Sequence, residues 1–178
     1  MSVYSLDSLQ PCEWGRPLVS PQLQPTHHLP QEASVVGMQI SPDQRYIVCV
    51  VRQFASPESL GDTDFPMAKE DVLLRLFDMR SGELVATLHG IRAFSSGAAT
   101  FLIFPEFSPC GQYLSCGSED GTIFIWSVQY GILLQKLTGH TNMVNFTAWH
   151  PTLPLLISGS DDQTLRLWDA REGTSLSL

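Results

Sequence analysis

A repeated segment constrains the fold of this chain more than any other feature. The residues SCGSEDGTIFIWSVQYG, 115–131, align without a gap with ISGSDDQTLRLWDAREG, 157–173, so the period is 42 residues. In both copies a proline precedes the tryptophan by 17 positions, an aspartate precedes it by six and a glycine follows it by five. Repeats of about 20 to 50 residues are typical of solenoids and propellers. We therefore expect a series of similar structural units.

A third, weaker copy precedes these two. Pro42 and Gly82 keep the proline and the glycine, and Phe77 stands where the other copies have tryptophan. Pro42 and Phe77 are 35 residues apart instead of 17, so the difference, 35 minus 17, indicates an insertion of eighteen residues. The polar, acidic segment at about 52–71 is the expected site of this insertion.

Short runs rich in β-branched and aromatic residues make up each copy. Turn sequences such as SPCGQ, SEDG and SDDQ separate these runs, as expected for short antiparallel strands. In the last copy the runs predict strands over 144–149, 155–158 and 164–168 and a fourth that begins near Thr174. Helical periodicity is not sustained anywhere, so the predicted fold class is all-β.

These motifs closely resemble those of the WD-repeat family, whose repeats fold as blades of a β-propeller. The residues that carry the resemblance are Gly139-His140, Ser158, Asp162 and Trp168-Asp169 in the last copy, and Asp120 and Trp126 in the copy before it. The resemblance implies blades of four antiparallel strands at 34–90, 91–137 and 138–178, the last truncated in its fourth strand. Residues 1–33, with five prolines, are expected to be a Pro-rich N-terminal arm, which could add a strand at 2–6 to an incomplete blade.

The resemblance also assigns a role to one polar constellation. It implies that His140, Ser158, Asp162 and Trp168 form a structural tetrad of hydrogen bonds within the third blade. An indole N–H and a hydroxyl buried without partners would each cost stability. The alternative is a hydrolase with Ser158 as nucleophile. A nucleophile needs an exposed position and an oxyanion hole, and nothing in the sequence signals either.

The second copy keeps only part of this motif. Asp120 and Trp126 are present, but Cys116 replaces the serine and Ile91 stands in register with the histidine. Its tetrad is therefore expected to be broken.

The number of repeats is too small for a closed ring. A propeller closes with roughly four to eight blades, and three copies are found, so we expect an incomplete, open propeller. Three architectures fit: a fragment or isoform of a larger propeller protein, a partial propeller completed by self-association through open blade edges, or one that docks into another protein. The first is favoured.

Composition excludes several kinds of ligand. The net charge of −8 argues against nucleic acid, which is bound through clustered Lys and Arg. Four cysteines without CxxC spacing, and an N-terminus unlike a signal peptide, favour an intracellular protein of the cytoplasm or nucleus. No apolar run approaches the roughly 20 residues of a membrane span. No phosphate loop indicates a cofactor, and His27-His28 and His150 lack neighbours that would make a metal site.

The favoured function is a non-enzymatic scaffold for protein–protein interaction. A sharper alternative rests on WDAR, 168–171, and its degenerate partner FDMR, 77–80. They resemble the Trp-Asp-any-Arg box of substrate receptors in cullin-based ubiquitin ligases, which implies adaptor contacts by Asp169, Arg171, Asp78 and Arg80. An enzyme-associated domain is the least favoured class, since Cys110 and Cys116 lack the cationic neighbours that activate a thiol.

Overall fold

The structure is a computed structural model that describes residues 2–4, 25–28, 34–53, 71–91, 104–170 and 174–177. These residues contain fourteen β-strands and no helix. The chain divides into two compact units, Met1–Gln31 and Glu32–Leu178. In none of the described ranges is there a helix that could cross a membrane.

The first unit contains one small sheet. Strands β1 (Ser2–Tyr4) and β2 (Pro25–His28) pair antiparallel, with Ser2 opposite His28. The sequence predicted a strand at 2–6 that would join a blade, whereas β1 pairs with β2 in a separate two-stranded sheet. A strand needs partners for its backbone groups, and a segment nearby in the chain provides them at lower closure entropy.

The second unit contains three four-stranded antiparallel sheets in chain order. The first consists of β3 (Ser34–Ile40), β4 (Tyr46–Gln53), β5 (Asp71–Asp78) and β6 (Leu84–Leu88). The second consists of β7 (Pro105–Phe107), β8 (Tyr113–Gly117), β9 (Ile123–Ser127) and β10 (Leu133–Leu137). The third consists of β11 (Val144–Trp149), β12 (Leu155–Ser160), β13 (Leu165–Asp169) and β14 (Thr174–Ser177).

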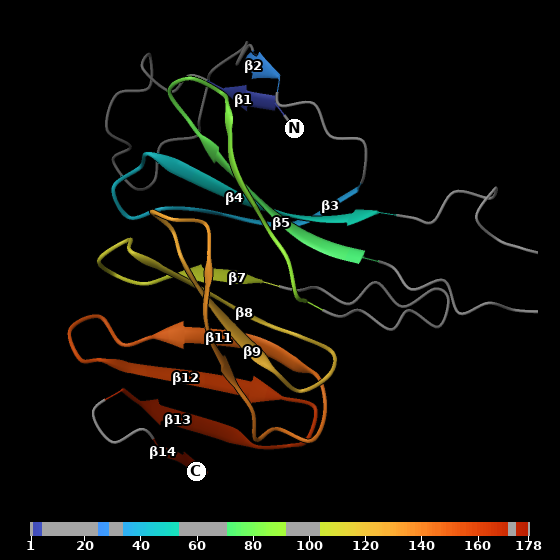
Figure 1. Cartoon of the computed structure of the whole chain (residues 1–178), viewed down its shortest axis with the longest axis vertical. Helices are drawn as coiled ribbons and strands as arrows, with labels where there is room; N and C mark the ends of the chain where they lie inside the picture. The colour runs from blue at the N-terminus through green and yellow to red at the C-terminus, as the bar shows by residue number, and fades with distance from the viewer. Residues whose placement is uncertain are drawn as a thin grey trace, which may run out of the picture. The chain divides into compact units, whose positions relative to one another are not determined.

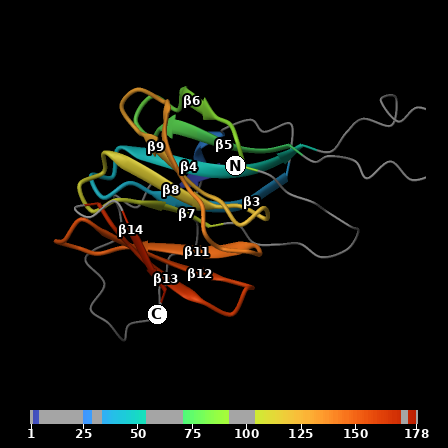
Figure 2. The same cartoon turned by 60° about the horizontal axis from the view of Figure 1, so that its bottom comes forward.

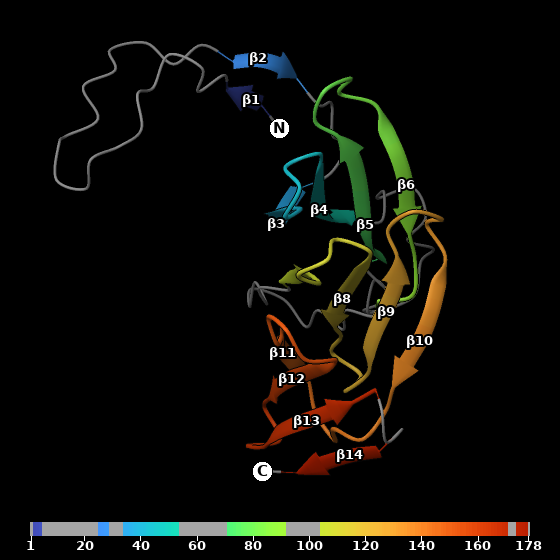
Figure 3. The same cartoon turned by 90° about the vertical axis from the view of Figure 1, so that its left-hand side faces the viewer.

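This arrangement confirms the predicted all-β class and the blades of four antiparallel strands. Within the second unit the sheets follow one another like layers of a stack (Figure 1, Figure 2). The first strands β3, β7 and β11 lie side by side, and Figure 3 shows β6 and β10 on the opposite side of the stack. The interior of the predicted insertion, residues 54–70, lies outside the described part of the chain.

Two apolar clusters hold the layers together. Between the first and second sheets, Leu74, Leu76, Leu114 and Trp126 are at most 1 % exposed. The second and third sheets share a smaller cluster, which contains Ile123, Val144, Leu156 and Trp168. Each sheet therefore acts as one wall of the core of its neighbour.

Polar contacts also join the second and third sheets, between β8 or the residue that follows it and β11. Ser115 Oγ lies 2.9 Å from Thr147 Oγ1, and the Val144 N–H donates to Ser118 O at 3.0 Å. A Cβ placed on Gly117 would lie 2.2 Å from Val144 O. Glycine is therefore required where β8 meets β11, because the two backbones approach too closely for any side chain.

Candidate interaction site

Four polar side chains of the third sheet form one hydrogen-bonded chain. The Trp168 indole N–H donates to Ser158 Oγ at 2.8 Å, and Ser158 Oγ lies 2.7 Å from His140 Nε2. On the other side of the ring, His140 Nδ1 lies 2.7 Å from Asp162 Oδ2. Strand β12 positions Ser158, β13 positions Trp168, and the turn between them positions Asp162. The structure thus brings together all four residues of the predicted tetrad.

The tautomer of His140 follows from these distances. If Nδ1 carries the hydrogen, it donates to Asp162, and Nε2 accepts from the Ser158 hydroxyl, whose oxygen accepts from Trp168. Every donor then has an acceptor. The serine, histidine and aspartate have the connectivity of a hydrolase triad. However, Ser158 is 1 % exposed and its oxygen is occupied by the indole.

Asp162 is kept ionised by its surroundings. Desolvation alone would raise its pKa, but hydrogen bonds from Thr164, His140 and Thr141 outweigh it and hold the pKa well below its usual range. The Thr164 hydroxyl donates at 2.7 Å and the Thr141 N–H at 3.1 Å. The carboxylate therefore joins the turn, the approach to β11 and the histidine.

The second sheet has an apolar version of this centre. Trp126 and Cys116 are buried, and Ile91 is 6 % exposed in the same cluster. Burial raises the pKa of the Cys116 thiol far above its ordinary value. Asp120 keeps a turn contact, in which its Oδ1 accepts the Thr122 N–H at 3.1 Å. Of the partial motif, Asp120 thus lies in a turn and Trp126 in the core.

The four residues that the sequence predicts to contact an adaptor lie in different settings. Asp78 accepts N–H groups of Arg80 and Ser81 and pairs with Arg45 at 3.1 Å. The Arg80 N–H and the Arg45 guanidinium hold the pKa of Asp78 below its usual range. Arg80 is exposed, Asp169 is half-buried at the end of β13, and Arg171 lies outside the described residues.

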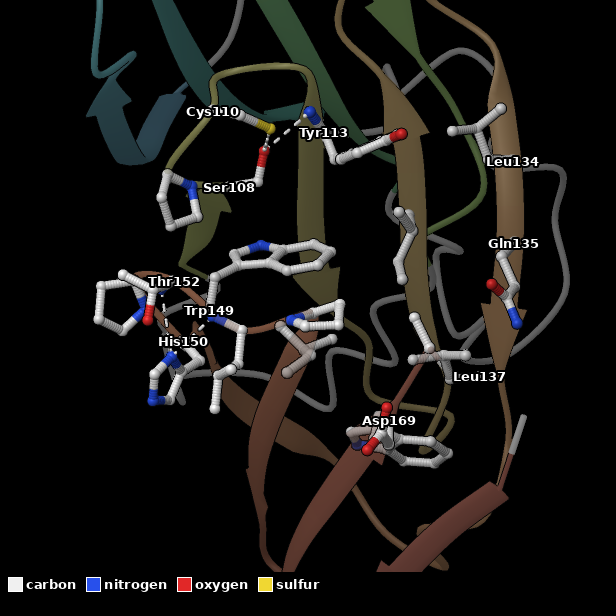
Figure 4. Close-up of a pocket in the computed structure, with 18 of the residues that line it drawn as sticks. Ser108, Cys110, Tyr113, Leu134, Gln135, Leu137, Trp149, His150, Thr152 and Asp169 are labelled. Carbon is white, nitrogen blue, oxygen red and sulfur yellow. Dashed lines mark hydrogen bonds between the residues drawn. The ribbon is translucent and has the colours of Figure 1, made fainter. Parts of the chain in front are cut away.

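A hollow of about 860 Å³ lies between the second and third sheets (Figure 4). We call it the inter-sheet groove. The lining side chains used below are Tyr113, Ile125, Gln135 and Leu137 from the second sheet and Trp149, Leu156, Trp168 and Asp169 from the third. The loops 108–110 and 150–154 add Cys110, His150 and Leu153. Its walls are thus mainly aromatic and aliphatic, with a few polar groups between them.

Hydrogen bonds fix the mouth of the groove. His150 Nδ1 accepts the N–H groups of Thr152 and Leu153 at 3.2 and 3.0 Å. The Trp149 indole N–H donates to Glu106 O at 3.3 Å, and its ring stacks on Tyr113 with centroids 6.3 Å apart. The polar contacts hold the loop in place, so Leu153 remains 45 % exposed.

The sequence predictions did not include this groove. The predicted strand over 144–149 ends at Trp149, and nothing in the repeat pattern relates Trp149 or His150 to the second blade. The segment HPTLPLL offers one signal, since it places Leu153 between two prolines.

Among the described residues, no three His, Cys, Asp or Glu side chains gather in a way that could hold a metal ion.

The chain is similar to WD-repeat proteins in sequence. A family model described as "WD domain, G-beta repeat" matches residues 82–127 and 131–169. F-box/WD repeat-containing protein 5 of Rattus norvegicus is 31 % identical over 145 residues, which cover 80 % of this chain and 25 % of that protein. WD repeat-containing protein 26 homolog of Drosophila melanogaster is 36 % identical over 104 residues, 57 % of this chain and 16 % of the relative. The chain thus spans a quarter or less of these relatives.

The fold is similar to that of solved propeller structures. The structure of U3-55K superposes with a TM-score of 0.62 at 22 % identity and covers 84 % of this chain and 40 % of that one. The four-stranded sheets, the repeated motif and the matched relatives agree with one another. The chain belongs to the WD-repeat family, as a partial propeller of three blades.

Proposed function

We propose that this protein is a non-catalytic platform for protein–protein interaction and that the inter-sheet groove receives an extended segment of a partner protein. The observation that carries the proposal is a hollow of about 860 Å³ with aromatic and aliphatic walls. Binding sites are typically concave, mostly apolar and fitted with a few polar groups that orient the ligand. Leu153 and Tyr113, 45 and 39 % exposed, supply the apolar contact area.

Burial of the tetrad supports a structural role for it. Ser158 and His140 are 1 and 7 % exposed, so a substrate has no direct approach to the hydroxyl. A net charge of −8 favours protein over nucleic acid as the partner. Free cysteines at positions 49, 110 and 116 are typical of a reducing compartment. These features support a site of action in the cytoplasm or nucleus.

The groove is tested by comparing partners of three tagged proteins in cells. Leu153→Asp puts a charge into the groove, whereas Ile132→Asp changes an apolar residue outside it that is 53 % exposed, against 45 % for Leu153. Quantitative mass spectrometry should show proteins that copurify with the wild type and Ile132→Asp but not with Leu153→Asp. The same set recovered with all three would rule out the groove as a binding site.

A second candidate function is that of substrate receptor in a cullin-based ubiquitin ligase. The observation that favours it is WDAR at 168–171, whose half-buried Asp169 lies at the end of β13 and lines the groove. Buried at an interface, an Arg–carboxylate pair is worth a few kcal/mol when one partner is truncated. Asp78 and Arg80 would supply a second, weaker contact.

A pull-down of the propeller-type adaptor tests this second candidate. Wild type and the exposed-charge control Asp161→Ala, outside the groove, should retain the adaptor, while Arg171→Ala should lose most of it and Arg80→Ala a smaller share. Equal recovery with all four proteins would remove the ligase function and leave the groove proposal untouched.

A further inference from the structure

The open face of the third sheet repeats a face that is already covered in the second sheet. Moving 42 residues along the chain takes Ile123 to Leu165 and Phe104 to Phe146. Ile123 is fully buried against the third sheet, and the Phe104 ring stacks on Phe146 with centroids 5.4 Å apart. The equivalent of Ile123, Leu165, is 54 % exposed, and the stacked rings of Phe104 and Phe146 are 36 and 58 % exposed. The third sheet thus carries the same kind of docking surface, left open.

A pair of glycines shows how closely this surface can be approached. At Gly117 a Cβ would meet Val144 O at 2.2 Å, so the glycine is needed for the contact with β11. At Gly159, one repeat later, the nearest atom to such a Cβ is Leu165 Cδ2 at 3.4 Å. Glycine inside a strand costs stability and often marks the close approach of another backbone. Gly159 therefore points to an approaching strand that is not among the described residues.

A backbone acceptor lies at the same place. Ser118 O accepts two N–H groups, from Gly121 at 3.2 Å and from Val144 at 3.0 Å. Its equivalent, Ser160 O, accepts the Gln163 N–H at 3.1 Å. A carbonyl oxygen has two lone pairs, so Ser160 O can accept a second N–H from a docked strand.

Strand β3 carries the complementary residues. Val35, Met38 and Ile40 precede Pro42 by seven, four and two positions, and in β11 Val144, Thr147 and Trp149 precede Pro151 by the same offsets. Both strands shift register at the same point, between Val35 and Gly37 and between Val144 and Phe146. The three β11 residues contact the second sheet, whereas Met38 and Ile40 are 57 and 51 % exposed.

Two matching replacements, one on the open face and one on β3, favour a second copy of this chain as the partner that covers the open face. In the contact between the second and third sheets, Ser115 and Thr147 form a hydroxyl pair at 2.9 Å. One repeat after Ser115 stands Ile157, 38 % exposed, and β3 has Met38 at the position of Thr147. Both members of the polar pair are thus replaced by apolar residues, which keeps the two faces complementary.

We infer that two copies of this chain associate head to tail, with β3 of each docked on the open face of the third sheet of the other. Val35 then lies against Gly159 and donates its N–H to Ser160 O, and Met38 lies against Ile157. A contact between unlike faces closes a ring when its rotation allows. Two copies of three blades supply a number of blades within the range of about four to eight at which propellers close. The inference does not depend on the inter-sheet groove.

Solution mass measured by light scattering tests the inference through two blocked variants. The wild type should be a dimer. Leu165→Asp blocks the open face and Met38→Asp blocks β3, so each alone should be a monomer. Mixed in equal amounts they should form a one-to-one dimer, because the intact β3 of one fits the intact open face of the other. Ile132→Asp, exposed elsewhere, should keep the mass of the wild type.

Three results would overturn the inference. A monomeric wild type at all concentrations would leave the open face to a blade of another chain. A Met38→Asp protein with the wild-type mass would mean that two third sheets meet face to face. A mixture that stays monomeric, although both variants keep the wild-type circular dichroism, would exclude the head-to-tail contact. If Leu165→Asp misfolds, Gly159→Ala replaces it on the open face, since its Cβ has room within one copy and should still weaken the dimer. If Met38→Asp misfolds, Ile40→Asp replaces it on β3, because Ile40 is 51 % exposed.

Discussion

Single residues decide how the third blade is held together. Ser158 joins Trp168 to His140, and Asp162 joins His140 to the turn before β13. The second blade reaches the same architecture with Cys116 and Ile91 packed around Trp126. A hydrogen-bonded centre and an apolar centre are therefore alternatives, but a mixture of the two leaves a buried polar group without a partner.

Removing one residue of the tetrad should show what a buried polar group without a partner costs in stability. Ser158→Ala deprives the Trp168 indole of its acceptor and the His140 ring of its donor, both at buried positions. We expect a loss of about 1–3 kcal/mol in the free energy of unfolding, the usual cost of an unsatisfied buried group. Urea denaturation measures it. Asp161→Ala, at an exposed neighbour, should change the free energy by no more than about 0.5 kcal/mol.

The depressed pKa of Asp162 makes the contribution of this residue pH-dependent. A carboxyl whose pKa is lower in the folded than in the unfolded chain stabilises the fold above the unfolded value, about 3.9. That contribution disappears as the pH falls through the folded pKa. Wild type should therefore melt at a higher temperature than Asp162→Asn at about pH 6, and the difference should shrink below about pH 4. A constant difference would contradict the hydrogen-bonded carboxylate.

At the scale of strands and sheets, the close approach of β8 to β11 sets the spacing of the second and third blades. Gly117 at the end of β8 lies against Val144 at the start of β11, whereas Tyr113 and Trp149, at the other ends of these two strands, line the inter-sheet groove. The groove is thus a consequence of blades that meet at one end.

The two equivalent glycines should respond differently to the same substitution. Gly117→Ala forces β8 and β11 apart, and overpacking of this kind costs about 1–3 kcal/mol. Gly159→Ala finds its nearest atom at 3.4 Å and should leave the stability of one copy close to that of the wild type. Chemical denaturation of dilute samples compares them. Equal destabilisation by both variants would mean that the fold of one copy, and not the contact, requires glycine.

A feature of the fold or of the candidate site could be predicted from the sequence when all its residues lie within one repeat. The spacing of His140, Ser158, Asp162 and Trp168 predicts a common sheet, and the structure places them in hydrogen-bonding distance. The groove could not be predicted in this way, because its lining residues, such as Gln135 and Trp149, come from different repeats, and the period does not encode how two repeats pack against each other. The pairing of β1 with β2 has no repeat to predict it.

For the whole molecule, burial is uneven among the three blades. Strands β8 and β9 lie between two other sheets, and Leu114 and Ile123 are fully buried. In the third blade Ile157 and Leu165 are 38 and 54 % exposed. The middle blade is therefore expected to open last, since local stability follows buried contacts.

Hydrogen exchange should resolve this order. In dilute samples the amides of β8 and β9 should exchange most slowly, and those of β13 and the outer strand β10 faster, because fewer apolar contacts cover them. Mass spectrometry after proteolysis measures the exchange. Equal protection of β9 and β13 would show that the polar tetrad alone protects the third blade as well as burial protects the second.

The different burial of the cysteines allows one of them to be labelled selectively. Burial raises the pKa of the Cys49 thiol to about 11 and that of Cys116 further, so both resist alkylation. Cys110 is exposed, beside Ser108 at the mouth of the groove. In a Cys12→Ser background, a thiol-reactive dye should therefore attach at this place in preference to the buried thiols. Its emission would report when the groove is filled, before any partner has been identified.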